Sequence, residues 1–401
     1  MKINAEAAGL DAGRLERVTE HLSRNYIDTG RIAGCQATVA RHGSVGYFQS
    51  LGSMDLERSK PVVDDTIWRI YSMTKPITGV ALMSLYERGL FQLSDPVHRF
   101  IPEWKGLKVK ETDADGSTRL VEPERPMIVR DLLMHMSGLG YGALSGATGA
   151  RPAARRQAGE TLKTMAQAIA EQPLEFHPGT KWLYGVSTDI CGRLVEILSG
   201  QRFDDYLQSE MFDPLGMPDT GFVVPDDKAD RFAANYQRAA DKSLTLIDDP
   251  ETSIYRRPRS FLSGGGGLVS TSADYLRFCQ MLLNGGELDG RRILGRKTVD
   301  LMRMNHLPGG GELRQFAAGP YGETGFDGVG FGLTMAVSLG PVESQTVGSA
   351  GDYYWGGAAS TIFWIDPAED LIVLFMTQFM PSGTFNFRGQ LKTTVYPAIV
   401  D

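Results

Sequence analysis

The sequence has 401 residues, of which 41 are lysine or arginine and 48 are aspartate or glutamate, giving a formal net charge of −7. This length exceeds the size at which one hydrophobic core stops growing, so we expect one large composite domain or two joined lobes with room for a sizeable pocket. The charge shows no block of one sign, which argues against nucleic acid or an anionic membrane as a partner and favours a small neutral molecule.

The N-terminal segment shows no secretory pattern, because no apolar run follows Lys2, and we therefore expect a cytoplasmic protein. Nowhere does the sequence hold the roughly 18 consecutive apolar residues that a membrane-spanning helix needs. Helical spacing of apolar residues behind a possible Asp11 cap predicts an amphipathic helix over 11–26 that packs on a sheet. Two runs rich in β-forming residues on either side of His42 and Gly43 then predict a β-hairpin.

The middle of the chain is predicted to be mainly helical. One helical pattern begins at Ser72 and stops near Gly89. Further helical patterns cover 127–136, 161–171, 186–200 and 273–286. Loops rich in proline or glycine, at 176–179 and 263–267, separate these helices and could line a pocket.

Strand patterns return after about Tyr321, over 329–340 and 356–379, and a closing helix could cover 387–400. Strands near both ends with helices between them predict an α/β (α+β) fold. In this fold an antiparallel sheet, formed from the N- and C-terminal segments, is flanked by helices and carries an inserted, mainly helical lobe. We expect residues 1–75 and 315–401 to form the sheet lobe and residues 76–314 the helical lobe, with an active site between them.

The cysteine and histidine patterns favour neither disulfides nor a metal site. Cys35, Cys191 and Cys279 are widely scattered, which predicts free, mostly buried thiols. The histidines include no pair at helical i,i+4 spacing and no HExxH motif. We therefore expect no metal and no other cofactor.

The candidate chemistry centres on Ser72-Met73-Thr74-Lys75. A hydroxyl and an amine three residues apart at the start of a helix face the same side of its first turn. Serine is a poor nucleophile unless a neighbour takes its proton, and an amine can do so where burial or nearby positive charge lowers its pKa. A helix cap followed by a solvated lysine gives the same pattern. No other SxxK and no GxSxG elbow occurs in the chain, and two further segments in the right order favour the catalytic interpretation.

The second segment places Tyr184 on a loop, after a His-Pro-Gly turn and before the helix predicted from residue 186. A loop can aim the phenol at Ser72. The phenol could then relay a proton between Ser72, Lys75 and a leaving group if the lysine's charge lowered its pKa. The alternative is a tyrosine whose ring only packs beneath the loop.

The third segment runs from Gly351 to Ala358 and enters a predicted strand. Its consecutive glycines would let a substrate approach the backbone closely. A strand N–H here, together with that of Ser72, could form an oxyanion hole. A β-bulge or a turn would explain the same glycines without a function.

These three segments, in this order and at these separations, resemble the SxxK, tyrosine and terminal-strand motifs of the serine β-lactamase and penicillin-binding protein superfamily. The resemblance spans most of the chain, because segments beginning at Leu132, Phe261 and Tyr354 resemble framework segments of the class C-like branch. In particular, the sequence is similar to family VIII carboxylesterases and to statin-type acyltransferases.

The resemblance implies a role for each motif residue. Ser72 would be acylated, Lys75 and Tyr184 would act as base and then acid, and the N–H groups of Ser72 and Ala358 would hold the oxyanion. The strand residues expected to contact the substrate are Trp355, Gly356 and Gly357.

Two departures from the β-lactamase pattern bear on the substrate. Where class C β-lactamases usually read Tyr-x-Asn, this chain has Val186, so an amide that would touch the lactam side chain is lost. Where they read Lys-Thr-Gly, this chain begins with Trp355, so the lysine that attracts the substrate carboxylate is lost. Both changes favour neutral esters over anionic lactams.

We therefore expect a serine hydrolase, specifically a carboxylesterase that hydrolyses small neutral esters through an acyl-enzyme on Ser72. Three alternatives stay open: acyl transfer to an alcohol acceptor, a β-lactamase or D-alanyl peptidase, and an inactive ligand sensor that keeps the penicillin-binding-like pocket. The sequence does not indicate the acyl chain, the stereochemistry or the oligomeric state.

Overall fold

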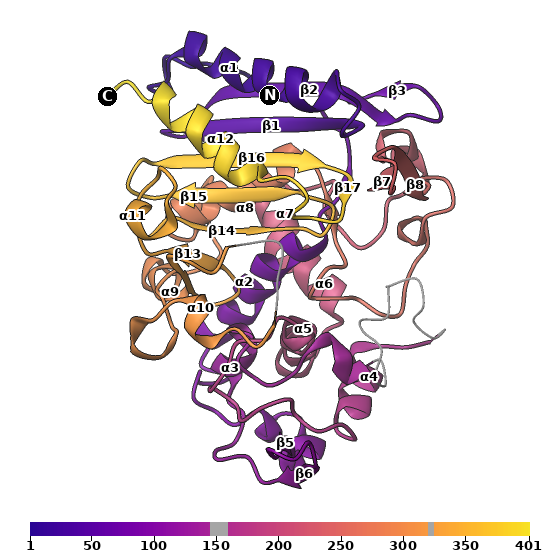
Figure 1. Ribbon diagram of the computed structural model, residues 1–401, viewed down its shortest axis with the longest axis vertical. Coiled ribbons are helices and arrows are strands. Elements are labelled where there is room, and N and C mark those ends of the chain that lie inside the picture. The colour runs from indigo at the N-terminus through magenta and orange to yellow at the C-terminus, as the bar shows by residue number, and fades with distance from the viewer. Residues whose placement is uncertain (145–158, 320–324) are drawn as a thin grey trace.

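A computed structural model of the protein describes residues 1–144, 159–319 and 325–401. Its largest feature is an antiparallel sheet in the order β12-β13-β14-β15-β16-β1-β2-β3 (Figure 1). The strands are β1 (Gly34–Arg41), β2 (Ser44–Asp55), β3 (Lys60–Pro61), β12 (Val329–Phe331), β13 (Ala336–Ser338), β14 (Tyr353–Gly356), β15 (Ile362–Asp366) and β16 (Leu371–Thr377).

The N- and C-terminal segments meet in the middle of this sheet, as the sequence predicts. β1 pairs with β16, in a register that joins Cys35 to Thr377. β1 and β2 form the predicted hairpin, in which His42 and Gly43 have φ angles of 54° and 69°. Two successive residues with positive φ give the turn whose twist matches that of the paired strands.

Helices cover the sheet. Near the N-terminus, α1 (Ala12–Leu22) is capped by Asp11, whose side chain accepts a hydrogen bond from the Arg14 N–H, and it continues as the π-helical turn η1 (Ser23–Ile27). α1 packs against β2 and against α12 (Phe387–Val395), and a 3-10 turn η11 (Tyr396–Ala398) ends the predicted closing helix early. α8 (Ser272–Leu283) packs against β15 and β16.

The helical part is built around α2 (Thr74–Glu87), whose residues from Thr74 to Leu85 are all buried. α2 packs against α5 (Ser187–Ser199), which also contacts the neighbouring short helices (Figure 1). The helix predicted over 127–136 is shorter than expected, because Met134 leaves the helix and His135 has a φ of 57°. The remaining helices are α3 (Val129–Leu133), α4 (Leu162–Ile169), α6 (Phe203–Leu207), α7 (Asp213–Leu215), α9 (Arg296–Met302), α10 (Leu313–Phe316) and α11 (Pro341–Ser344).

Short turns and strands complete the fold. The helical turns are η2 (Tyr71–Met73), η3 (Val97–Arg99), η4 (Pro102–Gly106), η5 (Tyr141–Leu144), η7 (Gln208–Phe212), η8 (Asp226–Arg231), η9 (Ile254–Arg256) and η10 (Pro308–Gly310). The short strands are β4 (Trp68–Arg69), β5 (Val109–Thr112), β6 (Thr118–Val121), β7 (Asn235–Arg238), β8 (Leu244–Asp248), β9 (Val269–Ser270), β10 (Glu287–Leu288), β11 (Arg291–Arg292) and β17 (Phe379–Met380).

The division into lobes at residues 75 and 315 stays a prediction, and α8 lies on the sheet although it belongs to the segment assigned to the helical lobe. The three cysteines are free and buried, as predicted. Among the described residues, no helix is both long and apolar enough to cross a membrane.

Candidate active site

Ser72 lies in η2, the turn that opens α2. The preceding residue, Tyr71, has a φ of 40°, a left-handed conformation that costs a residue with a side chain about 1–3 kcal/mol. The Tyr71 hydroxyl accepts a hydrogen bond from Asn235 Nδ2 at 3.0 Å, which ties this strained residue to β7. The chain is therefore held in a sharp corner directly before Ser72.

Lys75 stands beside Ser72, as the spacing of the motif predicts. Its Nζ donates hydrogen bonds to Ser72 Oγ at 3.2 Å and to the Gly265 carbonyl oxygen at 2.5 Å. Lys75 is fully buried, whereas Ser72 keeps 7% of its surface exposed. An amine excluded from water and in contact with a hydroxyl is the arrangement that removes a proton from a serine nucleophile.

Tyr184 completes the cluster, and its ring lies against Lys75. Lys75 Nζ is 4.4 Å from the centroid of the Tyr184 ring. The Trp355 Nε1–H donates to the Tyr184 hydroxyl at 3.3 Å, and the Trp182 ring stacks on the Tyr184 ring with centroids 6.0 Å apart. The structure thus brings Ser72, Lys75 and Tyr184 together from η2, α2 and the loop before α5.

His135 supports Tyr184 from the side, with ring centroids 4.7 Å apart. Burial, and secondarily the positive charge of Lys75, hold the pKa of His135 well below its ordinary value. His135 is therefore neutral near neutral pH and adds no second positive charge beside Lys75.

A glycine-rich segment, Ser263 to Gly267, forms the other side of Lys75. Asp189, in the first turn of α5, accepts hydrogen bonds from Ser263 Oγ at 2.5 Å and from the Gly265 N–H at 3.1 Å. A Cβ on Gly264 would lie 2.7 Å from the Thr188 carbonyl oxygen, and one on Gly265 would lie 2.9 Å from Asp189 Oδ2. Only glycine allows this close approach, so the segment presents the Gly265 carbonyl to Lys75.

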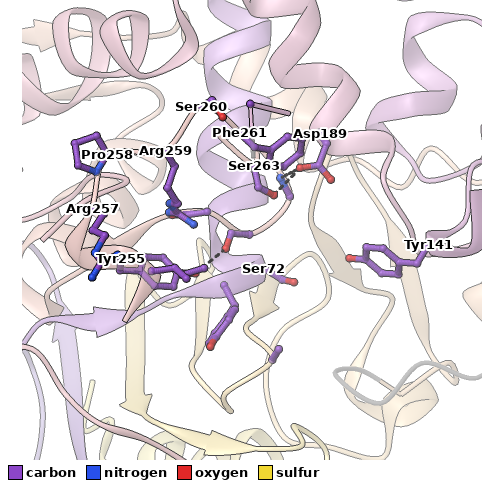
Figure 2. A pocket seen from close by; sticks show the side chains of 17 residues that line it. Ser72, Tyr141, Asp189, Tyr255, Arg257, Pro258, Arg259, Ser260, Phe261 and Ser263 are labelled. Carbon is purple, nitrogen blue, oxygen red and sulfur yellow. Dashed lines mark hydrogen bonds between the residues drawn. The ribbon is translucent and has the colours of Figure 1, made fainter. Parts of the chain in front are cut away.

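A cavity of about 550 Å³ opens above Ser72, a volume within the usual range for small-molecule sites. Figure 2 shows Ser72 between Tyr141 on one side and the segment from Tyr255 to Arg259 on the other. Its described lining residues are Tyr71, Ser72, Tyr141, Gly159, Asp189, Ile254, Tyr255, Arg257, Pro258, Arg259, Ser260, Phe261, Ser263, Gly265, Gly266, Gly267 and Ala358.

Ser72 and Ala358 both line this cavity, and neither peptide N–H has a hydrogen-bond acceptor in the part of the chain that the structure describes. The Ser72 N–H lies in the first turn of a helical segment, where N–H groups have no partner within the helix. Ala358 lies in the turn after β14 and not in a strand as the sequence predicts, because β14 ends at Gly356. Two unpaired donors facing one cavity can stabilise an oxyanion.

The three strand residues predicted to contact the substrate, Trp355, Gly356 and Gly357, do not line this cavity. Trp355 is 1% exposed because its indole packs beneath Tyr184. Gly356 and Gly357 line a second cavity, next to Arg388. Of the aromatic residues near the motifs, Tyr71, Tyr141 and Tyr255 line the cavity above Ser72, while Trp68, Tyr353 and Tyr354 do not.

Sequence reasoning missed two contributors to the site, Asp189 and the Gly265 carbonyl. The glycine run at 264–267 was visible as a possible pocket loop, and an acid in the first turn of the predicted helix over 186–200 was also visible. Neither pattern shows that the two segments meet, because they lie 76 residues apart along the chain.

Comparison with known proteins identifies the family of the chain. A family model described as Beta-lactamase matches residues 17–393. The chain is 30% identical to esterase EstB of Burkholderia gladioli, over 95% of each chain. It is 29% identical to monacolin J acid methylbutanoyltransferase of Aspergillus terreus, over 84% of each chain.

Solved structures show the same likeness. EstCE1, described as a hydrolase with promiscuous acyltransferase activity, superimposes with a TM-score of 0.78 at 27% identity, covering 97% of this chain and 99% of that one. This protein is therefore a serine hydrolase or acyltransferase with the β-lactamase fold. The chain belongs to the β-lactamase family, in the branch that contains family VIII esterases and statin-type acyltransferases.

Proposed function

We propose that the protein is a carboxylesterase that forms an acyl-enzyme on Ser72. The observation that carries this proposal is the 3.2 Å contact between Lys75 Nζ and Ser72 Oγ beneath a cavity of about 550 Å³. The unpaired N–H groups of Ser72 and Ala358 supply the oxyanion donors. Its partner is accordingly a small ester molecule.

The reaction proceeds in two half-reactions. Ser72 Oγ attacks the ester carbonyl carbon while Lys75, in its neutral form, or Tyr184, as a phenolate, accepts the hydroxyl proton. The carbon–oxygen bond to the alcohol then breaks, and the alcohol leaves with that proton. Water adds to the acyl-enzyme through the same groups, which releases the carboxylic acid and restores the Ser72 hydroxyl.

An ester is favoured over a lactam because strand β14 presents no cation to the cavity. Trp355 stands where a lysine would attract a lactam carboxylate, and its indole is covered by Tyr184. We infer that the reacting part of the substrate, the ester group itself, is small and neutral. The similarity to esterase EstB supports the same choice.

Intact-protein mass spectrometry after exposure to a short para-nitrophenyl ester and to a serine-directed phosphonate tests the proposal. We expect an adduct that peptide mapping places on Ser72, no adduct in Ser72→Ala, and a strongly slowed reaction in Lys75→Ala. Arg291→Gln, an exposed change on β11, is the matched control and should react normally. Full hydrolytic activity in folded Ser72→Ala would contradict the proposal.

A second candidate function is transfer of the acyl group to an alcohol. It is favoured by the 29% identity to monacolin J acid methylbutanoyltransferase and shares the first half-reaction with hydrolysis. Product analysis with a rising concentration of a competing alcohol distinguishes the two. A constant rate of acid release supports hydrolysis, whereas near-complete conversion to the new ester supports transfer.

A further inference from the structure

One wall of the cavity above Ser72 carries two arginines. Arg257 and Arg259 both line the cavity, Arg257 exposed and Arg259 half-buried. In Figure 2 they lie on the same side of Ser72, across the cavity from Tyr141. The sequence motifs concern charge only at strand β14 and assign these two residues no role.

Neither guanidinium group is neutralised by a carboxylate in the described part of the chain. Arg259 donates to the carbonyl oxygens of Phe222 at 2.9 Å and of Gly267 at 2.8 Å, and it lies 4.4 Å from the centroid of the Tyr255 ring. These partners hold the guanidinium in place without cancelling its charge. The side chain of Arg257 makes no hydrogen bond or ion pair there.

The adjacent Arg256 shows the contrast. Its Nη2 is 2.5 Å from Asp226 Oδ1, so this arginine has a counter-ion, and it does not line the cavity. Of these three arginines, the two without a carboxylate partner among the described residues are thus the ones that line the cavity.

The described lining of the cavity carries a positive surplus. Asp189 is the one carboxylate among its described lining residues, and its Oδ1 already accepts from Ser263 and from the Gly265 N–H. Two guanidinium groups remain on the wall of a concave site, in a chain whose net charge is −7. A cleft lined by one sign of charge focuses its field and concentrates ligands of the opposite sign.

We propose that Arg257 and Arg259 form a subsite for a carboxylate of the substrate, placed several bonds away from the ester carbonyl. The inference rests on the proposed esterase function and names its substrate class: small esters that carry a second, anionic group. It departs from the expectation of an entirely neutral substrate, since β14 offers no cation but Arg257 and Arg259 line the cavity.

The two arginines have different roles in this subsite. Arg259 is already fixed by two carbonyl groups and a ring, so it presents its guanidinium with little further loss of side-chain freedom. Arg257 is exposed and free to close on a bound carboxylate, and guanidinium groups match carboxylates in shape as well as charge. Because Arg259 also ties down the glycine-rich segment at Gly267, changes at Arg257 are the cleaner test.

The experiment compares paired esters in which a carboxylate replaces a neutral group at the same position. On the alcohol side the pair is para-acetoxybenzoate and para-acetoxybenzamide, and on the acyl side it is the para-nitrophenyl monoester of glutaric acid and para-nitrophenyl valerate. We expect the native enzyme to prefer the anionic ester in at least one pair, by a ratio of kcat/KM that falls as salt is added. Arg257→Gln should lower that ratio about fivefold and Arg257→Glu more than tenfold. Arg257→Lys, which keeps the positive charge, should retain most of the preference for the anionic ester.

Arg291→Gln, which removes an exposed charge away from the cavity, should leave the ratio unchanged. The inference would be overturned if Arg257→Glu left the ratio of kcat/KM unchanged for both pairs, or if the native enzyme preferred the neutral esters. In either case, hydrolysis of the esters would still support the proposed function. If no ester is hydrolysed, calorimetry on Ser72→Ala still tests the subsite. Tighter binding of para-acetoxybenzoate than of the benzamide, lost on adding Arg257→Glu, supports it, and equal binding overturns it.

Discussion

Replacement of Asp189 tests whether this residue holds the glycine-rich segment of the active site in place without taking part in the reaction. Asp189 is 3% exposed, and one of its oxygens accepts hydrogen bonds from Ser263 and from the Gly265 N–H. A hydrogen bond to a charged group contributes about 1.5–3 kcal/mol and a neutral one about 1 kcal/mol. Asp189→Asn, which turns two charged bonds into neutral ones, should lower the free energy of unfolding by about 1–2 kcal/mol. Asp189→Ala, which leaves the buried Gly265 N–H and the half-buried Ser263 hydroxyl without this acceptor, should lower it by about 3 kcal/mol.

The effect on activity follows from the Gly265 carbonyl, which accepts a hydrogen bond from Lys75. A displacement of about 1 Å in a catalytic group can cost about a hundredfold in rate. We expect kcat to fall about tenfold in Asp189→Asn and about a hundredfold in Asp189→Ala, with KM little changed.

Ester hydrolysis and urea unfolding measure both effects. Asp205→Asn is the control, since Asp205 is an acid in the first turn of α6 whose side chain is 69% exposed. If folded Asp189→Ala kept kcat within about twofold of the native value, the proposed role of the glycine-rich segment would be refuted.

Three further changes have expected outcomes. Trp355→Phe removes the donor to the Tyr184 hydroxyl, and we expect kcat for ester hydrolysis to fall about threefold to tenfold. Burial raises the pKa of Asp274 to about 6, so the folded state binds more protons than the unfolded state between about pH 4 and 6. The contribution of Asp274 to native stability should therefore fall as the pH rises from about 4 to 6, so thermal unfolding should show that the native protein gains less stability, or loses more, than Asp274→Asn over this range. Asp352 is buried, and its carboxylate lies 2.7 Å from Lys392 Nζ. Lys392→Met removes this cation, and we expect the free energy of unfolding, measured in urea, to fall by about 3 kcal/mol.

Each of these changes has its own control or contrary result. Equal kcat in Trp355→Phe and the native enzyme would show that the indole N–H does not position Tyr184. A native stability that rose from about pH 4 to 6 as steeply as that of Asp274→Asn would contradict the raised pKa. Lys297→Met, at an exposed position 4.0 Å from Asp300, should change stability by less than about 0.5 kcal/mol.

Local sequence patterns predicted the parts of the fold and site that depend on short-range geometry. The spacing of Ser72 and Lys75 was sufficient to predict their contact, because two residues three apart at the start of a helix lie on the same face of that helix. The turn at His42 and Gly43 was equally local. The pairing of β1 with β16 was predictable only in outline, from strand patterns at both ends of the chain.

Features that depend on contacts between distant segments were not predictable. The contact of Asp189 with Gly265 joins the start of a helix to a loop, and each segment by itself is explained by ordinary capping and turn rules. The end of β14 at Gly356 was missed because the following residues continue a pattern typical of a strand, although the chain turns at Ala358. Tertiary packing decides such boundaries where local preference is weak.

The two departures from the β-lactamase motifs, Val186 and Trp355, have the same structural feature: both side chains are buried. Val186 is 1% exposed at the start of α5, and Trp355 is 1% exposed beneath Tyr184. Positions that hold polar, substrate-contacting groups in class C β-lactamases therefore hold apolar side chains that pack inside this protein. The proposed recognition of charge therefore depends on residues that line the cavity, namely Arg257 and Arg259. In the proposed function the two features complement each other: β14 lacks the cation that would attract a lactam carboxylate, and Arg257 and Arg259 supply the proposed subsite for the carboxylate of an ester.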